Sequence, residues 1–105
     1  MLPYDEHTPT YDLQQVQRLV GQGASTCRVT EAALLGGEAV GMDRNAIVAV
    51  VLSLEPGDFY KTMEADLSPG LWQDVYRRCV DERELYIKLQ VDHTGRAVVI
   101  QFKRR

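Results

Sequence analysis

The sequence lacks the features that identify a membrane, secreted or metal-binding protein. Its longest run of apolar residues, Ala46 to Leu52, is far below the roughly 18–20 residues that a membrane-spanning helix needs. The beginning of the chain has neither the basic flank nor the apolar block of a secretory signal. Cys27 and Cys79 form no Cys-x-x-Cys pair, and His7 and His93 are far apart in the sequence. We therefore expect a cytoplasmic protein with no membrane segment and no metal site, whose cysteines are reduced and partly buried.

Motifs of nucleotide-dependent and cofactor-dependent enzymes are also missing. The chain contains no Gly-x-Gly-x-x-Gly, no Walker-type loop, no nucleophile elbow and no His-Glu-x-x-His. The glycines at positions 36, 37 and 41 do not follow a predicted strand and lack the spacing of a dinucleotide-binding loop. We predict that the protein uses no cofactor.

Length and composition predict one globular domain over residues 1–105. The chain is long enough for a hydrophobic core, and its 45% apolar and 26% charged residues are ordinary for such a domain. A net charge of −3 argues against a protein that coats nucleic acid through bulk electrostatics. However, residues 1–76 hold four basic and eleven acidic side chains, whereas residues 77–105 hold eight basic and four acidic ones. The basic carboxyl-terminal part suggests a local anionic ligand, although a solvated charged face gives the same pattern.

The first half of the chain has the apolar spacing of helices. Residues 1–10 are polar, contain two prolines and predict an extended lead-in. Apolar residues then recur at helical spacing over residues 13–20, after Asp12 as a cap and with Gln15 in the capping-box position. The glycines between positions 21 and 23 are expected to end this first helix.

Two further helices are expected before residue 55. Thr30 can cap a helix that continues weakly across its two internal glycines to Val40. Asp43 can cap a third helix, Arg44 to Ser53. The β-branched run Ile47 to Val51 in this segment also fits a buried strand, so both alternatives stay open.

After residue 58 the pattern changes to short extended segments that end in a hairpin. Two apolar sets must share one face of this hairpin, because a slip of one residue would turn a strand over. These sets are Leu85, Ile87, Leu89 and Val91 in one strand, and Val98, Ile100 and Phe102 in the other. The sequence therefore predicts an α+β fold, with N-terminal helices packed on a mainly antiparallel, twisted sheet.

The turn of the hairpin determines which polar residues are neighbours. A two-residue turn at Thr94-Gly95 places Tyr86 opposite Lys103, and Lys88 opposite Gln101. A turn at Gly95-Arg96 would instead pair Lys88 with Lys103. In both cases Tyr86 and Lys103 share the polar face.

Aromatic and basic residues are concentrated in two segments, residues 58–63 and 71–77. Together these segments combine stacking faces, hydrogen-bonding groups and positive charge, as single-stranded RNA-binding surfaces do. We predict that these residues bind the substrate, together with a histidine near the end of the chain: Tyr60, Trp72, Arg77 and His93.

Four polar residues are candidates for catalysis, because the predicted strands could gather them on one face: Lys61, Gln73, Tyr86 and Lys103. RNA carries its own nucleophile, the 2′-hydroxyl, so a nuclease need only align it, move protons and neutralise charge on the phosphorane. Lysines suit the neutralising role, a phenol or amide can hydrogen-bond the reacting groups, and no metal ion is required. Taken singly, each lysine also fits an exposed solubilising residue, and Tyr86 fits a half-buried strand residue.

Several of these segments together resemble the MqsR family of bacterial toxins. The similarity covers nearly the whole chain after residue 10, and Trp-Gln-Asp-Val-Tyr-Arg is its most specific string. The matching segments are Asp58-Phe59-Tyr60-Lys61-x-Met63, Trp72 to Arg77, Tyr86-x-Lys88 and Phe102-Lys103, with Gln15-Val16, Leu19-Val20, Ala33-Leu34-Leu35 and Gly41-Met42-Asp43 upstream.

The resemblance implies a RelE-like fold and a ribosome-independent mRNA endonuclease that cuts at short GC-containing sites. It also implies a cognate antitoxin with a zinc-binding domain and a helix-turn-helix domain, through which the toxin would contact DNA only indirectly. The active-site positions of the family fall on Lys61, Gln73, Tyr86 and Lys103, and a histidine near the hairpin tip falls on His93.

Two differences from the family bear on this interpretation. Members of the family are basic, whereas this chain is acidic, which weakens long-range attraction of RNA. The hairpin tip is also about two residues longer, a change that preserves which residues share a face and carries His93 away from the site.

The leading hypothesis is a metal-independent endoribonuclease that leaves a 2′,3′-cyclic phosphate or 3′-phosphate and a 5′-hydroxyl. The alternative is a non-catalytic module that acts only through an antitoxin and DNA complex.

Overall fold

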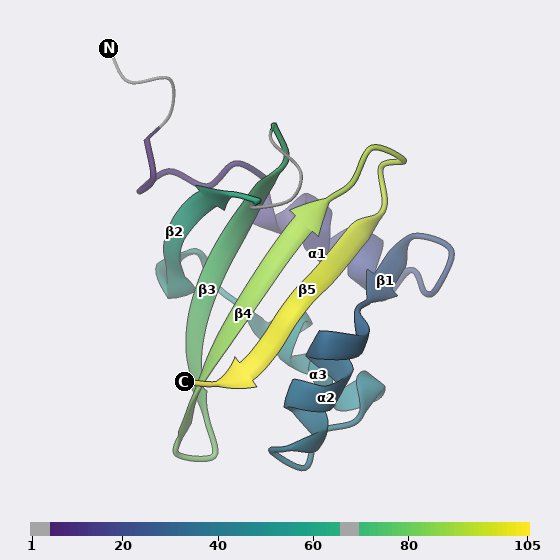
Figure 1. The fold of residues 1–105 in the computed structure, drawn as a ribbon, viewed down its shortest axis with the longest axis vertical. Coiled ribbons are helices and arrows are strands. Elements are labelled where there is room, and N and C mark those ends of the chain that lie inside the picture. The colour runs from purple at the N-terminus through teal and green to yellow at the C-terminus, as the bar shows by residue number, and fades with distance from the viewer. Residues whose placement is uncertain (1–4, 66–69) are drawn as a thin grey trace.

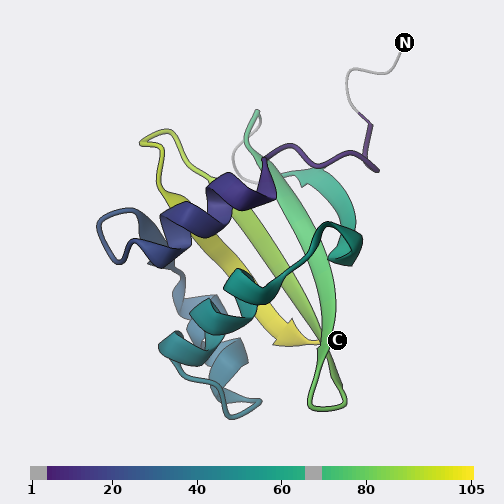
Figure 2. The same cartoon turned by 180° about the vertical axis from the view of Figure 1, so that it is seen from behind.

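The computed structural model describes residues 5–65 and 70–105, which form an α+β fold. In chain order the elements are α1 (Leu13–Gly21), β1 (Cys27–Val29), α2 (Glu31–Glu38), α3 (Arg44–Ser53), the 3-10 helix η1 (Pro56–Asp58), β2 (Phe59–Glu64), β3 (Trp72–Val80), β4 (Arg83–Val91) and β5 (Ala97–Arg104). The strand order is β1-β5-β4-β3-β2, with β1 parallel to β5 and the other neighbours antiparallel. The helices lie behind the twisted sheet in Figure 1 and in front of it in Figure 2. The predicted fold class is confirmed.

Side-chain caps begin all three described helices at the predicted residues. The side chains of Asp12, Thr30 and Asp43 each accept a hydrogen bond from a backbone N–H in the first turn of the following helix. Thr30 Oγ1 also donates to the carbonyl oxygen of Ile100 at 2.7 Å, which ties the beginning of α2 to β5. Residues 44–53 are helical, so the strand alternative for Ile47 to Val51 is wrong. No helix in the described ranges is long and apolar enough to cross a bilayer.

Two glycines lie inside α2 because neighbouring elements leave no space for a side chain. A Cβ atom at Gly36 would overlap the backbone carbonyl oxygen of Phe102 in β5. A Cβ atom at Gly37 would lie 2.6 Å from Cδ1 of Ile47 in α3. The glycines therefore lower helix propensity but let α2 pack directly on both elements. The helix ends at Glu38, two residues before the predicted end at Val40.

The hydrophobic core lies between the helices and one side of the sheet. Tyr76 and Phe102 are the largest of its buried side chains. Of the two cysteines, Cys27 is buried in this core and Cys79 is exposed near the end of β3, so the partial burial predicted for both is wrong.

The segment before α1 is attached to the sheet. The backbone N–H of Thr8 donates to the carbonyl oxygen of Asp5 at 3.0 Å, so the chain turns there and is not extended as predicted. Further along, the buried carboxylate of Asp74 in β3 accepts the N–H groups of Thr10 and Tyr11 at 3.0 and 2.9 Å. The remainder of the predicted lead-in, residues 1–4, lies outside the described ranges.

The hairpin of β4 and β5 changes register halfway along its length. Tyr86 pairs with Lys103 and Lys88 with Gln101, as the turn at Thr94-Gly95 predicts. Beyond them Leu89 pairs with Val99, so Ile100 is an extra residue that forms a β-bulge in β5.

The loop explains why the bulge is needed. The N–H of Asp92 donates to the carbonyl oxygen of Arg96 at 2.9 Å, and the three intervening residues form the loop, with Gly95 at a φ of +82°. A three-residue loop shifts the pairing by one residue relative to the predicted two-residue turn, and the bulge shifts it back. As a result Ala97, Val99 and Phe102 belong to the core. The prediction that Val98 and Ile100 share this face is wrong.

Candidate functional site

Strand alternation places a set of polar side chains on the side of the sheet that faces away from the helices, which we call the open face. The register joins these residues into cross-strand rows, and the helices of the described ranges lie on the opposite side. The open face carries Lys61, Met63, Gln73, Val75, Arg77, Tyr86, Lys88, Gln90, Gln101 and Lys103. The four predicted catalytic residues are all among them.

Two lysine ammonium groups lie near the ring of Tyr86 on the open face. The Nζ atom of Lys103 lies 5.5 Å from the centre of this ring, and the Nζ atom of Lys88 lies 5.9 Å from it. Tyr86, Lys88, Gln101 and Lys103 line a hollow of about 360 Å³ together with the last two arginines of the chain. An anion in this hollow would meet two ammonium groups and a phenol, which suits a phosphate group.

A second group of side chains combines an aromatic face with two cations. A β-bulge between Phe59 and Lys61 removes Tyr60 from the regular pairing of β2, and the Tyr60 side chain is 42% exposed. The guanidinium carbon of Arg77 lies 4.2 Å from the centre of the Tyr60 ring, and Nζ of Lys61 lies 5.6 Å from it. Such a surface can stack a base and attract the adjacent phosphate.

Glu84 connects Arg77 to the carboxyl end of the chain. Its Oε1 atom lies 3.4 Å from Nε of Arg77 and 3.1 Å from Nη1 of Arg105. The carboxylate thus holds two guanidinium groups beside the row that contains Tyr86. Sequence reasoning missed Glu84 and Arg105. The available signal was spacing: Glu84 lies two residues before Tyr86 in β4, and Arg105 lies two residues after Lys103, just beyond the end of β5.

Lys61 and Gln73 share the open face with Tyr86 but lie farther from it. Lys61 belongs to the same cross-strand row as Lys88, two strands away, which separates their backbones by about 10 Å. Gln73 lies four residues along β3 from the residue opposite Tyr86, or roughly 13 Å, and its Nε2 is 3.5 Å from Oε1 of Gln90. Among the predicted catalytic residues, Tyr86 and Lys103 are direct neighbours.

The structure places Trp72 and His93 away from the other predicted site residues. Alternation along β3 puts Trp72 on the helix side, with Asp74, and its carbonyl oxygen accepts a hydrogen bond from the Tyr11 hydroxyl at 2.7 Å. His93 is exposed in the loop of the β4–β5 hairpin, beyond the end of β4 that is distant from Tyr86 (Figure 1). The fold therefore does not gather these two residues on the open face.

Comparison with known proteins finds matches along almost the full length of the chain. A family model described as "Motility quorum-sensing regulator, toxin of MqsA" matches residues 8–104. The mRNA interferase toxin MqsR of Escherichia coli (strain K12) is 34% identical over 101 residues, which cover 96% of this chain and 99% of that protein. Both matches extend from before α1 into the last strand.

Proposed function

The chain belongs to the MqsR toxin family, and from this membership and the open face we propose that it is an mRNA interferase that cuts single-stranded mRNA. The observation that carries the proposal is the position of Tyr86 between the ammonium groups of Lys88 and Lys103. The family description pairs the toxin with MqsA, so the protein has an antitoxin as its partner.

The cleavage reaction follows from the chemistry of RNA. The 2′-oxygen attacks the adjacent phosphorus atom, the bond to the 5′-oxygen of the next nucleotide breaks, and that oxygen takes up a proton. The products are a 2′,3′-cyclic phosphate, or the 3′-phosphate after hydrolysis, and a 5′-hydroxyl. The protein contributes alignment, proton transfer and stabilisation of the charge on the phosphorane. These tasks require no metal ion.

Each predicted catalytic residue has a role in this reaction. Lys103 lies against Tyr86 and stabilises the charged phosphorane, and Lys61 adds positive charge along the bound strand. Tyr86 orients the phosphate or takes part in proton transfer, and Gln73, roughly 13 Å away along β3, holds a neighbouring part of the bound strand with its amide. Lys88 joins this set because its ammonium group lies as close to the Tyr86 ring as that of Lys103, within half an ångström.

The position of a bound base relative to the scissile phosphate follows from the strand register. Arg77 pairs directly with Tyr86, and its guanidinium group covers the Tyr60 ring. A base stacked on Tyr60 would therefore have its own phosphate beside Arg77. The next phosphate along the RNA, the one that reacts, would then lie at Tyr86. We infer that single-stranded RNA runs across β2, β3 and β4 on the open face.

The resemblance supports further features of the biological context. We propose that the enzyme acts in the cytoplasm, independently of the ribosome, at short GC-containing sites. We also propose that its antitoxin has a zinc-binding domain and a helix-turn-helix domain, so that any contact with DNA is made through the antitoxin.

Cleavage of a long RNA in the presence of EDTA tests the enzymatic proposal. The wild-type protein should cut the RNA, whereas Lys61→Ala and Tyr86→Phe should abolish or strongly slow cleavage. Tyr76→Phe is the matched control, since it removes a hydroxyl from the helix side of the neighbouring strand and should leave the rate unchanged. A wild-type protein that binds the antitoxin tightly but never cuts RNA would support the non-catalytic module. Cleavage that needs a divalent ion, or is unchanged in both variants, would refute the assigned chemistry.

A further inference from the structure

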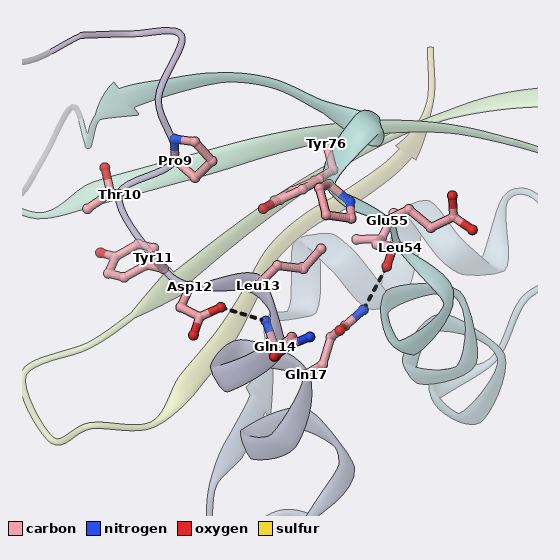
Figure 3. A pocket seen from close by; sticks show the side chains of 11 residues that line it. Pro9, Thr10, Tyr11, Asp12, Leu13, Gln14, Gln17, Leu54, Glu55 and Tyr76 are labelled. Carbon is pink, nitrogen blue, oxygen red and sulfur yellow. Dashed lines mark hydrogen bonds between the residues drawn. The ribbon is translucent and has the colours of Figure 1, made fainter.

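A second concave site lies on the helix side of the sheet, separate from the open face. It is a cavity of about 610 Å³ between the segment before α1, the helix α1 itself and η1, with Tyr76 of β3 at its base (Figure 3). Cavities of about 300–1,000 Å³ are the usual size for small-molecule sites. Because the sheet separates this cavity from Tyr86 and Lys103, RNA bound on the open face does not fill it.

The hydroxyl group of Tyr76 is the polar feature of the cavity. The Tyr76 side chain is only 2% exposed, its ring packs edge-on against Phe59, and its hydroxyl points into the cavity (Figure 3). Within residues 5–65 and 70–105 no group forms a hydrogen bond with it. Burial holds the pKa of this phenol well above its ordinary value, so the group stays a neutral hydroxyl. The hydroxyl oxygen borders the cavity, so a polar group of a bound ligand can form a hydrogen bond with it.

The charge around the hydroxyl determines which ligand groups the cavity favours. Among the described residues that line it, Asp12 and Glu55 carry carboxylates and none is a lysine or arginine. The negative charges of Asp74, Asp12 and Asp58 also act on the Tyr76 phenol. Asp74 is committed to two backbone N–H groups and Asp58 to Arg78, whereas Asp12 uses only one oxygen, as the cap of α1. Asp12 thus keeps one carboxylate oxygen free of hydrogen bonds to the described residues, on an exposed side chain at the edge of the cavity.

The remaining walls of the cavity are apolar. They are formed by Pro9, Leu13, Leu54 and Pro56, together with the ring of Tyr11. Apolar walls with a few polar groups that fix orientation are typical of small-molecule sites.

We propose that this cavity binds a small organic cation with an apolar body, such as an arylalkylamine. Its ammonium group lies between the carboxylate of Asp12 and the hydroxyl of Tyr76, to which it donates hydrogen bonds. Its apolar body lies against Leu13, Leu54 and Pro56. The size of the cavity, its acidic lining residues, and a Tyr76 hydroxyl that faces it without a hydrogen bond to the described residues support a free small molecule as the occupant.

Binding of three isosteric probes to the full chain tests the proposal. We expect benzylamine to bind saturably, measured by calorimetry or by shifts of amide signals around the cavity, and benzyl alcohol and benzoate to bind more weakly. Saturable binding of benzylamine should persist in the presence of a short, uncleavable RNA. Displacement of the amine by RNA, or equal binding of the three probes, would overturn the proposal, as would the absence of benzylamine binding to wild type.

Two conservative variants connect the binding to the named groups. Tyr76→Phe removes only the hydroxyl, and Asp12→Asn removes the charge while keeping a good helix cap. Each should weaken benzylamine binding about tenfold, the usual effect of losing a hydrogen bond to a charged group. Asp43→Asn is the matched control, because Asp43 caps α3 and does not line this cavity. Thermal unfolding should show that all three variants are folded. Unchanged affinity in both cavity variants, or an equal loss in Asp43→Asn, would contradict the assignment.

Discussion

Tyr86 and Lys103 lie directly opposite each other in β4 and β5, with the ammonium group of Lys103 5.5 Å from the centre of the Tyr86 ring. This pairing depends on the bulge at Ile100, because without the extra residue the three-residue loop would place Phe102 opposite Tyr86. The lysine would then face the core side of the sheet. The phenol of Tyr86 and the ammonium group of Lys103 are therefore neighbours on the open face because of the β-bulge farther along the hairpin.

Replacing Lys103 should separate the effect of charge from that of shape. Lys103→Ala should slow single-turnover cleavage by roughly 10²–10³-fold, the usual effect of removing a group that stabilises transition-state charge. Lys103→Arg should retain part of the activity because the charge remains. Arg18→Ala, which removes one exposed charge from α1, should cleave RNA at the wild-type rate. Equal losses in the alanine and arginine variants would show that charge is not what Lys103 contributes.

The exposed ring of Tyr60 should contribute to RNA binding by stacking. Tyr60→Ala should weaken binding of a short single-stranded RNA by about 1–3 kcal/mol, whereas Tyr60→Phe should bind nearly as well as wild type because the ring is kept. Fluorescence anisotropy with an uncleavable RNA measures both affinities. Equal weakening in the two variants would assign the effect to the hydroxyl and contradict the stacking interpretation.

Glu84 should limit the positive charge that the open face offers to RNA. Glu84→Gln removes the carboxylate that lies between Arg77 and Arg105, so we expect tighter binding and a salt dependence that is steeper by roughly one phosphate contact. Glu82→Gln, in the turn between β3 and β4, removes the same charge away from this ion pair and is the matched control. If Glu84→Gln instead bound RNA more weakly, the main role of Glu84 would be to orient the two arginines for RNA binding and not to neutralise their charge.

Gly36 should tolerate no side chain, because α2 packs on the backbone of β5 at this position. Gly36→Ala should lower the free energy of unfolding by about 1–3 kcal/mol, as overpacking usually does, and should also slow cleavage because Lys103 follows the displaced Phe102. Gly57→Ala, which adds a methyl group in open space, should change the stability little. Urea unfolding provides the comparison. A Gly36→Ala protein as stable as Gly57→Ala would contradict the close packing of α2.

The helices could be predicted because their signals are local. Asp12, Thr30 and Asp43 each cap a helix through a side chain only two or three residues from its hydrogen-bond donor. Tyr86 and Lys103 share one face as predicted, but only because the bulge at Ile100 cancels the shift made by the three-residue loop.

Other features required knowledge of which strands are neighbours. The loop length at Gly95 and the bulge at Ile100 compensate for each other, so neither is apparent from the alternation of the final strand. The strands that pair with β3 are not apparent from the sequence, so the side of the sheet on which Trp72 lies could not be predicted. For the same reason it did not bring Glu84 beside Arg77.

The bulge at Ile100 also couples the length of the hairpin loop to the register of the strands. A related toxin that lost one loop residue and the bulge residue together would keep its tyrosine and lysine as neighbours, since the two deletions cancel in the strand register. The end of the hairpin that carries the reactive groups keeps its register only when a one-residue change in the loop is matched by a change at the bulge. Loops of different reach can then evolve toward different partners while the chemistry of cleavage is inherited unchanged.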